Sequence, residues 1–367
     1  MVKARLGDLV KIRTGKLDAN VASENGRYPF FTCAIQPLRI NSYSYDCECV
    51  LVAGNGDLNV KYYNGKFDAY QRTYIIESND HDILKCKYLY LFMNFYIDKL
   101  RKDSIGGVIK YIKLGNLTEA VLELPDIKKQ QELIDKFDLL TTLIVLRKQQ
   151  LSKLDQLVKS RFIEMFGECK TNPKNWKLLN MEDIAVVGSS KRVFVEELQE
   201  DGIPFYRGTE VGALAEGKSI VPELYIAENH YKELVKATGI PQLGDLLMPS
   251  ICPDGRIWVV NTENPFYFKD GRVLWIHNID TKFNSTFLLY TLKDRIMTDY
   301  LSIASGTTFS ELKIFTLKKC KIFSVPLPLQ EQFAAFVEQV EKAKSSVKQS
   351  LEKLETLKKA LMQEYFG

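Results

Sequence analysis

Residues 130–167 read QQELIDKFDLLTTLIVLRKQQLSKLDQLVKSRFIEMFG and decide the fold of this 367-residue chain. The stretch holds no proline, and its one glycine is the last residue. Its apolar side chains follow a four–three alternation at Leu133, Phe137, Leu140, Ile144, Leu151, Leu154, Val158 and Met165. A period of 3.5 residues is typical of a helix that packs along another helix. At 1.5 Å per residue, such a helix is roughly 60 Å long.

The same pattern returns 200 residues later, in residues 330–367. The matches without a gap include Gln130, Lys148, Gln149, Leu151, Lys153, Leu154, Leu157, Lys159, Glu164, Phe166 and Gly167, which recur as Gln330, Lys348, Gln349, Leu351, Lys353, Leu354, Leu357, Lys359, Glu364, Phe366 and Gly367. Upstream, Gly106, Lys113 and Leu117 recur as Gly306, Lys313 and Leu317. The second apolar stripe is Phe333, Val337, Val340, Val347, Leu351, Leu354, Leu361 and Tyr365. Since neither stripe can stay exposed, the two helices are predicted to pack on each other, with Arg147, Arg161, Lys344 and Lys358 interrupting the seams.

The segments between the helices predict many short strands and one main helix each. In 1–124, apolar runs such as YPFF (28–31) alternate with turn signals at GNGD (54–57) and YNGK (63–66), and a helix is expected near 86–101. In 168–326, IPFY (203–206) resembles YPFF, and a helix is expected near 285–302. A glycine turn follows each helix, at 104–112 and 304–312. The chain is therefore predicted to be α+β, with an internal pseudo-two-fold repeat of four segments: 1–124, 125–167, 168–326 and 327–367.

Composition limits the class of protein. The net charge of +4 is too small to indicate nucleic-acid binding by itself. No apolar run reaches the roughly 18 residues of a membrane span, and the first residues lack the apolar region of a signal peptide, so we expect a cytoplasmic protein without a membrane partner. The seven cysteines form no CxxC pair, and the three histidines lie far apart, so neither a disulfide framework nor a metal site is expected.

Catalytic motifs are absent or incomplete. The sequence has no phosphate-binding loop with a Walker A lysine. Asn264–Tyr267 reads NPFY, which is similar to the Asn-Pro-Pro-Tyr element of amino-methyltransferases, but Phe266 stands where that element has proline, and no glycine-rich loop for S-adenosylmethionine accompanies it. We interpret the segment as a turn at the edge of a strand and predict no catalytic residue.

Taken together, these features resemble the specificity (S) subunits of type I restriction–modification systems. The resemblance covers nearly the whole chain. It rests on the duplicated halves, the opening LGDL (6–9), IPFYRGTEV (203–211), GDLLMPS (244–250) and, above all, ASGTTFSELKIFTLKKCKIFSVPLPLQEQ (304–332). The first half carries degenerate versions, IGGVIKYI and LPDIKKQQ.

The resemblance implies a division of labour. Segments 1–124 and 168–326 would be target-recognition domains, each reading one half of a bipartite sequence in double-stranded DNA. The helices 125–167 and 327–367 would pair antiparallel, set the spacer between the half-sites and dock two modification (methyltransferase) subunits. The chain itself would bind no cofactor, because S-adenosylmethionine belongs to the modification subunits, and ATP and magnesium serve partner subunits that include the restriction subunits.

Candidate DNA contacts are polar, basic or aromatic residues near the predicted turns, because arginine and asparagine read base edges and lysine or tyrosine suits phosphates or stacking. They are Asn55, Lys61, Tyr63, Lys66, Arg72 and Lys110 in the first segment, the first five from a predicted hairpin over 55–72, and Arg207, Thr209, Glu210, Ser250, Arg256 and Thr308 in the second. Two alternatives stay open: a stand-alone DNA-binding or architectural protein, which would not co-purify with a methyltransferase, and a divergent DNA adenine methyltransferase, which would bind S-adenosylmethionine.

Overall fold

The computed structural model describes residues 2–305 and 310–367. The chain forms two compact units: unit 1 comprises Met1–Gln150 and Val347–Gly367, and unit 2 comprises Leu151–Ser346. The two stretches with the 3.5-residue period are 40-residue helices, α4 (Ile127–Phe166) and α9 (Leu327–Phe366). Helix α4 begins in unit 1 and ends in unit 2, whereas α9 begins in unit 2 and ends in unit 1. The α+β class with two long helices is confirmed.

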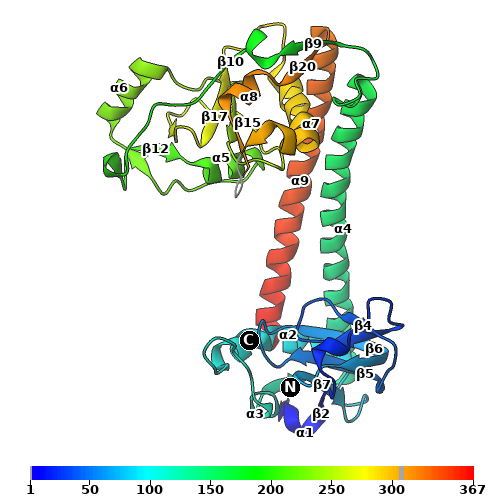
Figure 1. The fold of residues 1–367 in the computed structure, drawn as a ribbon. Helices are drawn as coiled ribbons and strands as arrows, with labels where there is room; N and C mark the ends of the chain where they lie inside the picture. Colours follow the sequence, from blue (N-terminus) through cyan, green and yellow to red (C-terminus); the bar gives the residue numbers. More distant parts are fainter. Residues whose placement is uncertain (1, 306–309) are drawn as a thin grey trace. The chain divides into compact units, whose positions relative to one another are not determined.

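Unit 1 is built on a six-stranded sheet in the order β2-β7-β5-β6-β3-β4. These strands are β2 (Val10–Thr14), β3 (Tyr28–Phe31), β4 (Leu38–Ile40), β5 (Tyr45–Ala53), β6 (Val60–Ala69) and β7 (Thr73–Ser78). A separate pair joins β1 (Val2–Arg5) to β8 (Val121–Leu124), and the helices are α1 (Leu6–Leu9), α2 (Cys86–Asp103) and α3 (Leu114–Thr118). Figure 1 shows α2 beside the sheet, where Tyr88, Phe92 and Met93 enter the core.

Unit 2 repeats this plan with shorter strands. One sheet has the order β10-β17-β14-β15 and a second the order β11-β13-β12-β16. The strands are β10 (Val186–Gly188), β11 (Leu198–Gln199), β12 (Ile203–Tyr206), β13 (Tyr225–Ile226), β14 (Leu246–Pro249), β15 (Trp258–Val259), β16 (Tyr267–Phe268) and β17 (Val273–His277), with the pairs β18 (Ala304–Ser305) with β19 (Glu311–Leu312) and β9 (Lys177–Asn180) with β20 (Lys321–Ser324). The helices are α5 (Gly208–Ala215), α6 (Glu228–Thr238), α7 (Ser285–Ile303) and α8 (Ile314–Lys318).

The two units share one strand order. The order β2-β7-β5-β6 corresponds to β10-β17-β14-β15, and the parallel pair β3–β6 corresponds to the parallel pair β12–β16. The long strand β6 reaches both β5 and β3, whereas in unit 2 its counterpart is divided into β15 and β16. The predicted turn YNGK (63–66) is therefore wrong. It lies inside β6, and the positive φ of 132° at Gly65 is accommodated within the strand.

The repeat extends to buried side chains. Gln130 and Gln330 are both fully buried in the first turn region of their helices. The Gln130 Nε2 donates to the carbonyls of Ile83 (2.8 Å) and Pro125 (2.9 Å), and its Oε1 accepts from the Lys85 N–H at 3.0 Å. This amide therefore ties together the strand that precedes α4, the segment before α2, and α4 itself.

Gln330 makes the equivalent set in unit 2. Its Nε2 donates to the carbonyls of Lys282 (3.0 Å) and Val325 (2.7 Å), and its Oε1 accepts from the Asn284 N–H at 2.9 Å. Two glutamines 200 residues apart thus satisfy the same three backbone groups in the two units, which confirms the internal repeat at the level of single atoms.

Each long helix is held by a partner helix within both units, and polar contacts define the direction of pairing. In unit 1, Lys148 pairs with Glu355 at 2.8 Å, and Lys358 Nζ donates to Thr141 Oγ1 at 2.9 Å. Residue numbers fall along α9 as they rise along α4, so the pairing is antiparallel, as Figure 1 shows.

The lysines that interrupt the apolar seam have polar partners. In unit 2, the Lys344 side chain is 16% exposed and pairs with Asp155 and Glu341, each at 2.7 Å. In unit 1, burial lowers the pKa of Lys358, and its ammonium donates to Thr141. These seam cations therefore fix register through specific partners rather than through apolar contact.

The C-terminal ends of both helices enter the cores. Phe366 packs against Tyr88 and Phe137 in unit 1, and its repeat counterpart Phe166 packs against Phe287 and Phe333 in unit 2. The compact units are consequently larger than the predicted segments 1–124 and 168–326. Whether those segments are the functional boundaries stays a prediction.

Candidate nucleic-acid interface

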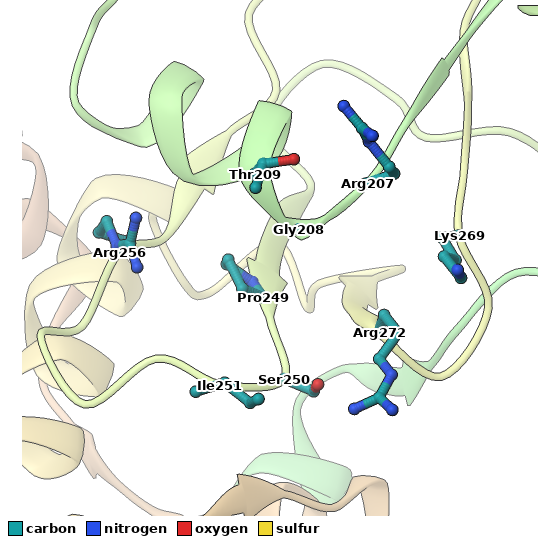
Figure 2. A pocket seen from close by; sticks show the side chains of 9 residues that line it. All are labelled: Arg207, Gly208, Thr209, Pro249, Ser250, Ile251, Arg256, Lys269 and Arg272. Carbon is teal, nitrogen blue, oxygen red and sulfur yellow. The ribbon is translucent and has the colours of Figure 1, made fainter. Parts of the chain in front are cut away.

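A hollow of about 460 Å³ lies in unit 2 where three chain segments meet. It is lined by Arg207, Gly208, Thr209, Pro249, Ser250, Ile251, Arg256, Lys269 and Arg272 (Figure 2). The segments are the step from β12 into α5, the residues that follow β14, and the turn between β16 and β17. The structure therefore brings together Arg207, Thr209, Ser250 and Arg256, four of the residues predicted from the sequence of the second segment.

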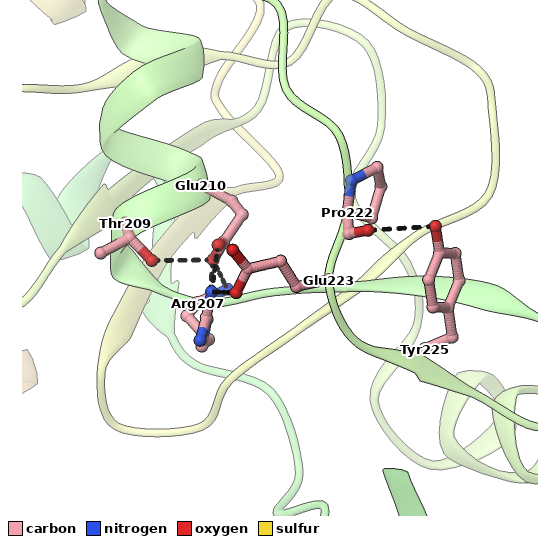
Figure 3. Close-up of polar contacts among 6 residues, drawn as sticks. All are labelled: Arg207, Thr209, Glu210, Pro222, Glu223 and Tyr225. Atoms are coloured by element: carbon pink, nitrogen blue, oxygen red, sulfur yellow. Dashed lines mark hydrogen bonds and ion pairs between the residues drawn. The ribbon is translucent and has the colours of Figure 1, made fainter. Parts of the chain in front are cut away.

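Arg207 is held by two carboxylates (Figure 3). Its Nη2 donates to Glu210 Oε1 at 2.6 Å and to Glu223 Oε2 at 2.7 Å. The segment that carries Glu223 is itself fixed by the Tyr225 hydroxyl, which donates to the Pro222 carbonyl at 3.1 Å. The guanidinium is thus positioned before any ligand arrives, so little side-chain entropy is lost when it binds.

Glu210 organises the start of α5. It accepts from the Arg207 N–H at 2.8 Å, which satisfies the backbone N–H of the N-cap residue, and from the Thr209 hydroxyl at 2.9 Å. Burial by itself raises the pKa of this carboxyl, but the hydrogen bonds from Arg207 and Thr209 outweigh it and hold the pKa at about 2. Glu210, predicted as a DNA contact, is in this structure the residue that orients Arg207.

Arg256 and Arg272 approach the hollow from other segments. Arg256 pairs with Asp254 at 2.8 Å and lies against α5, where a Cβ at Gly212 would meet its Nη1 at 2.9 Å. Arg272 forms an ion pair with Glu311. A Cβ at position 212 would therefore shift the end of the flexible Arg256 side chain.

Ser250 is the most deeply buried polar residue of the lining. It is 2% exposed, and its hydroxyl donates to Glu311 Oε1 at 3.2 Å, while Lys313 Nζ lies 3.4 Å from the other carboxylate oxygen. Ser250 therefore supports the loop that carries the cations. Thr308 lies outside the described residues.

The hollow as a whole is a set of directed hydrogen-bond donors. Arg207, Arg256 and Arg272 each have a carboxylate behind them, and Lys269 is exposed at the rim. Arginine forks held in this way suit phosphate oxygens and the acceptor edges of bases. Among the described residues that line it, none is a histidine, a cysteine or a carboxylate.

In unit 1, three of the predicted residues gather at the matching place. The Gly56 N–H donates to the Lys110 carbonyl at 2.9 Å, and Asn55 forms a β-bridge with Tyr111. The Gly54 N–H donates to the Arg72 carbonyl at 2.8 Å. Asn55, Arg72 and Lys110 therefore lie together where β5 ends.

The other predicted residues of unit 1 lie along β6. Lys61 is half-buried near the end of β5. Burial lowers its pKa, and its ammonium donates to Asn59. Lys66 is five residues further on, a distance of roughly 17 Å in a strand, and lies over the Tyr43 ring at 4.8 Å. Tyr63 packs against Phe31, with ring centroids 5.0 Å apart.

The hairpin predicted over 55–72 is therefore wrong, because β6 (Val60–Ala69) pairs with β5 on one side and β3 on the other. The sequence also missed two cations of unit 2, Lys269 and Arg272. Arg272 could have been found, since it lies 200 residues after Arg72.

The two aromatic rings of the NPFY segment are buried. Phe266 is 4% and Tyr267 1% exposed, and the Tyr267 hydroxyl accepts from the Lys191 N–H at 3.0 Å. Both rings belong to the core around β16, as the interpretation of a strand-edge turn predicted. This arrangement disfavours the methyltransferase alternative.

One cluster of possible metal ligands lies in unit 1. Ligand atoms of Glu48, His81 and Cys86 lie within 4.8 Å of one another. The Tyr62 hydroxyl donates to Glu48 at 2.8 Å, and burial raises the pKa of the Cys86 thiol to about 11. The Cys86 thiol donates to the Glu48 carbonyl at 3.4 Å. We read the cluster as a hydrogen-bonded link between β5 and α2.

The described residues contain no helix that is both long and apolar enough to cross a membrane.

Comparison with known proteins agrees with the fold. A family model described as the type I restriction modification DNA specificity domain matches residues 1–156 and 173–356. The EcoDI specificity subunit of a type I restriction enzyme from Escherichia coli is 29% identical over 374 residues, which cover 91% of this chain and 80% of that protein. A putative type I restriction enzyme specificity subunit from Haemophilus influenzae is 26% identical over 340 residues, covering 89% and 83%.

A solved structure shows the same fold. The type I restriction–modification S subunit from M. genitalium matches with a TM-score of 0.63 at 15% identity, covering 100% of this chain and 96% of that one. Because the family model spans both halves of the chain, the resemblance noted in the sequence is confirmed. The chain belongs to the family of specificity subunits of type I restriction–modification systems.

Proposed function

We propose that each unit reads one half of a two-part sequence in double-stranded DNA. The observation that carries this proposal is that the two units share the same backbone hydrogen bonds but surround them with different side chains. The Gly54 N–H donates to the Arg72 carbonyl in unit 1, and the Ser250 N–H donates to the Arg272 carbonyl at 2.9 Å in unit 2. Around these bonds the polar groups differ, with Asn55 and Lys110 in one unit and Arg207 and Arg256 in the other. The same backbone arrangement with different side-chain hydrogen-bond donors suits the reading of two different base sequences.

The long helices link the two reading units. In this proposal, α4 and α9 fix the separation of the half-sites, so the spacer has a constant length. The pairs Lys148–Glu355 and Lys344–Asp155 support this role, because they fix the register of the two helices on either side of the boundary between the units.

The same helices offer docking faces. Several apolar residues of the helices are exposed: Leu139 (60%), Val145 (47%), Leu146 (52%) and Leu357 (47%) in unit 1, and Leu157 (48%) in unit 2. Leu157 and Leu357 are repeat counterparts. In this proposal two methyltransferase subunits cover these faces in a pseudo-two-fold arrangement, and restriction subunits join the full complex.

The chain itself catalyses no reaction in this proposal. The hollow offers arginine, lysine and hydroxyl donors, and the aromatic rings of the NPFY segment are buried. Adenine methylation with S-adenosylmethionine belongs to the methyltransferase subunits, and ATP-driven cleavage with magnesium belongs to the restriction subunits.

DNA binding by the isolated chain is expected to be weak and sensitive to salt. Residues 1–124 carry 17 lysines and arginines against 14 acidic residues, and residues 168–326 carry 19 against 20. Such a mild balance releases few counterions, so the methyltransferase subunits complete the grip on DNA. Nanomolar sequence-specific binding by the purified chain alone, at physiological salt, would contradict this. Failure to co-purify with a methyltransferase would favour a stand-alone DNA-binding protein.

Exchange of one unit tests modular reading. Residues 1–124 are replaced by the first segment of another family member, and the hybrid is produced with its methyltransferase partner. The methylated sequence should change in one half-site only. A change in the half-site assigned to unit 2 would show that the units do not read independently.

A further inference from the structure

The two units can be compared position by position through their hydrogen bonds. The carbonyls of Gly54 and Ser250 accept from the N–H groups of Ile112 (3.0 Å) and Leu312 (2.8 Å). These are in addition to the bonds from Gly54 and Ser250 to the carbonyls of the two arginines, Arg72 and Arg272. In both units, then, the residue that follows the third strand in the sheet order, β5 or β14, is hydrogen-bonded to the same two neighbouring segments.

Other bonds and the strand register extend the comparison. The Tyr70 N–H donates to the Phe31 carbonyl at 2.9 Å, and the Lys269 N–H donates to the Tyr206 carbonyl at 2.9 Å. Continued past the last paired residues, the register of β5 with β6 places Asn59 opposite Ala53, and that of β14 with β15 places Arg256 opposite Pro249. Because Ala53 and Pro249 directly precede Gly54 and Ser250, Asn59 and Arg256 occupy corresponding positions. The corresponding residues are Thr32 and Arg207, Asn59 and Arg256, Tyr70 and Lys269, Tyr111 and Glu311, Arg72 and Arg272, and Lys113 and Lys313.

Two of these six positions keep their charge. Arg72 and Arg272 are both arginine, and Lys113 and Lys313 are both lysine, whereas the other four positions change chemistry completely. Both lysines precede a short helix and have their N–H bound by a side chain three residues on, Asn116 Oδ1 at 2.8 Å and Thr316 Oγ1 at 3.2 Å. The shared cations are therefore presented by the same backbone geometry in both units.

We infer that Arg72 with Lys113, and Arg272 with Lys313, bind the phosphate backbone at the same place in each half-site. This inference rests on the proposed function. Two units that read different sequences meet different base edges but the same phosphates. Side chains common to both units suit the invariant part of DNA, and side chains that differ suit the bases. The internal repeat thus separates positioning residues from specificity residues within one chain.

Exposure and charge at these positions agree with phosphate binding. Arg72 and Lys113 are exposed, and the side chains of Arg272 and Lys313 are 59% and 58% exposed. In unit 2, Glu311 contacts both cations and leaves one net positive charge. In unit 1 the neutral Tyr111 replaces it, so the pair keeps both charges. Unit 1 consequently contributes more to the salt dependence of binding than unit 2.

The test uses the complete complex of this chain with its proposed methyltransferase partner. Arg72→Ala and Arg272→Ala are compared with Arg5→Ala, an exposed arginine on the separate β1–β8 pair. Binding is measured by titration at several salt concentrations, on DNA with the methylated sequence and on DNA without it. Arg72→Ala and Arg272→Ala should each bind both DNAs about 3- to 10-fold more weakly and lower the slope of log affinity against log salt concentration by about 0.9. The methylated sequence should stay unchanged.

A second variant keeps the inference testable should an alanine variant not fold. Glu311→Gln removes the negative charge beside Arg272 and Lys313 while keeping a hydrogen-bond acceptor for Ser250. It should strengthen binding to both DNAs and steepen the salt slope. The inference is overturned when Arg72→Ala or Arg272→Ala relaxes base preference in one half-site, when the slope matches that of Arg5→Ala, or when Glu311→Gln leaves the slope unchanged. A wild-type complex that methylates no two-part sequence contradicts the proposed function instead, whatever the slopes.

Discussion

The paired glutamines at the start of the long helices give the sharpest stability prediction. Replacing Gln330 by alanine removes an amide that is fully buried and that satisfies three backbone groups, at Lys282, Asn284 and Val325. The change should destabilise unit 2 strongly, although the residue touches no candidate DNA contact.

The size of the effect follows from the groups left behind. The buried Val325 carbonyl and the part-buried Lys282 carbonyl and Asn284 N–H lose their partner, and each group left without a partner away from water costs about 1–3 kcal/mol. Water can reach some of them after the truncation, so we expect a loss of about 3–6 kcal/mol in the free energy of unfolding of unit 2. That is a large part of the stability of a typical domain.

Tryptophan fluorescence reports on unit 2 alone. The three tryptophans, Trp176, Trp258 and Trp275, all lie in unit 2, whereas unit 1 has none. Urea unfolding of Gln330→Ala, followed by fluorescence, should shift to a much lower midpoint. Gln130→Ala makes the equivalent loss in unit 1, so it should shift the circular-dichroism transition more than the fluorescence transition.

Gln332→Ala is the matched control, because it removes an exposed glutamine two residues away in the same helix. Its free energy of unfolding should stay within about 0.5 kcal/mol of the wild type. If Gln330→Ala were as stable as Gln332→Ala, the reasoning from buried backbone groups would be refuted.

Three further predictions concern the hollow and the helices. The Glu210 carboxyl has a pKa of about 2, below its ordinary 4.5. Its charged form therefore stabilises unit 2 above about pH 4.5, and this stabilisation is lost as the pH falls toward 2. In urea titrations at pH 7 and pH 3, the free energy of unfolding should fall less for Glu210→Gln than for the wild type. Arg256→Ala should relax base preference in one half-site only, as seen in a methylation map; relaxation in both would contradict the assignment. Four residues inserted after Gln150 and after Ser346 lengthen both helices by roughly 6 Å and should lengthen the spacer by about one or two base pairs. Two-residue insertions at the same places turn the apolar stripe by about 200° and should abolish methylation by the complex. An unchanged spacer in an active four-residue variant would show that the helices do not set the spacer length.

The long helices could be predicted from the sequence because their signal is local and repeated. The 3.5-residue period and the 200-residue offset place α4 and α9 to within a few residues, and the helices expected near 86–101 and 285–302 are α2 and α7. The strands were harder. YNGK resembles a tight turn, but pairing of β6 on both edges holds Gly65 within a strand, and such non-local pairing leaves no mark in a short window of sequence.

The candidate site could be predicted in part, and for a similar reason. Residues near one another in the chain, such as Arg207 and Thr209, were found together. Arg272 was missed because it joins them only through the pairing of β14 with β17. Glu210 and Ser250 were identified as polar residues near a turn, but burial gives them supporting roles that residue type alone does not reveal.

A genome-wide map of adenine methylation tests two-part reading of DNA by this chain most directly. Cells that lack other adenine methyltransferases produce this chain together with the methyltransferase subunit that we propose as its partner. The methylated sites should share one sequence in two parts, separated by a non-specific gap of constant length. Methylation of a single uninterrupted sequence, or of two-part sites with variable gaps, would contradict this prediction.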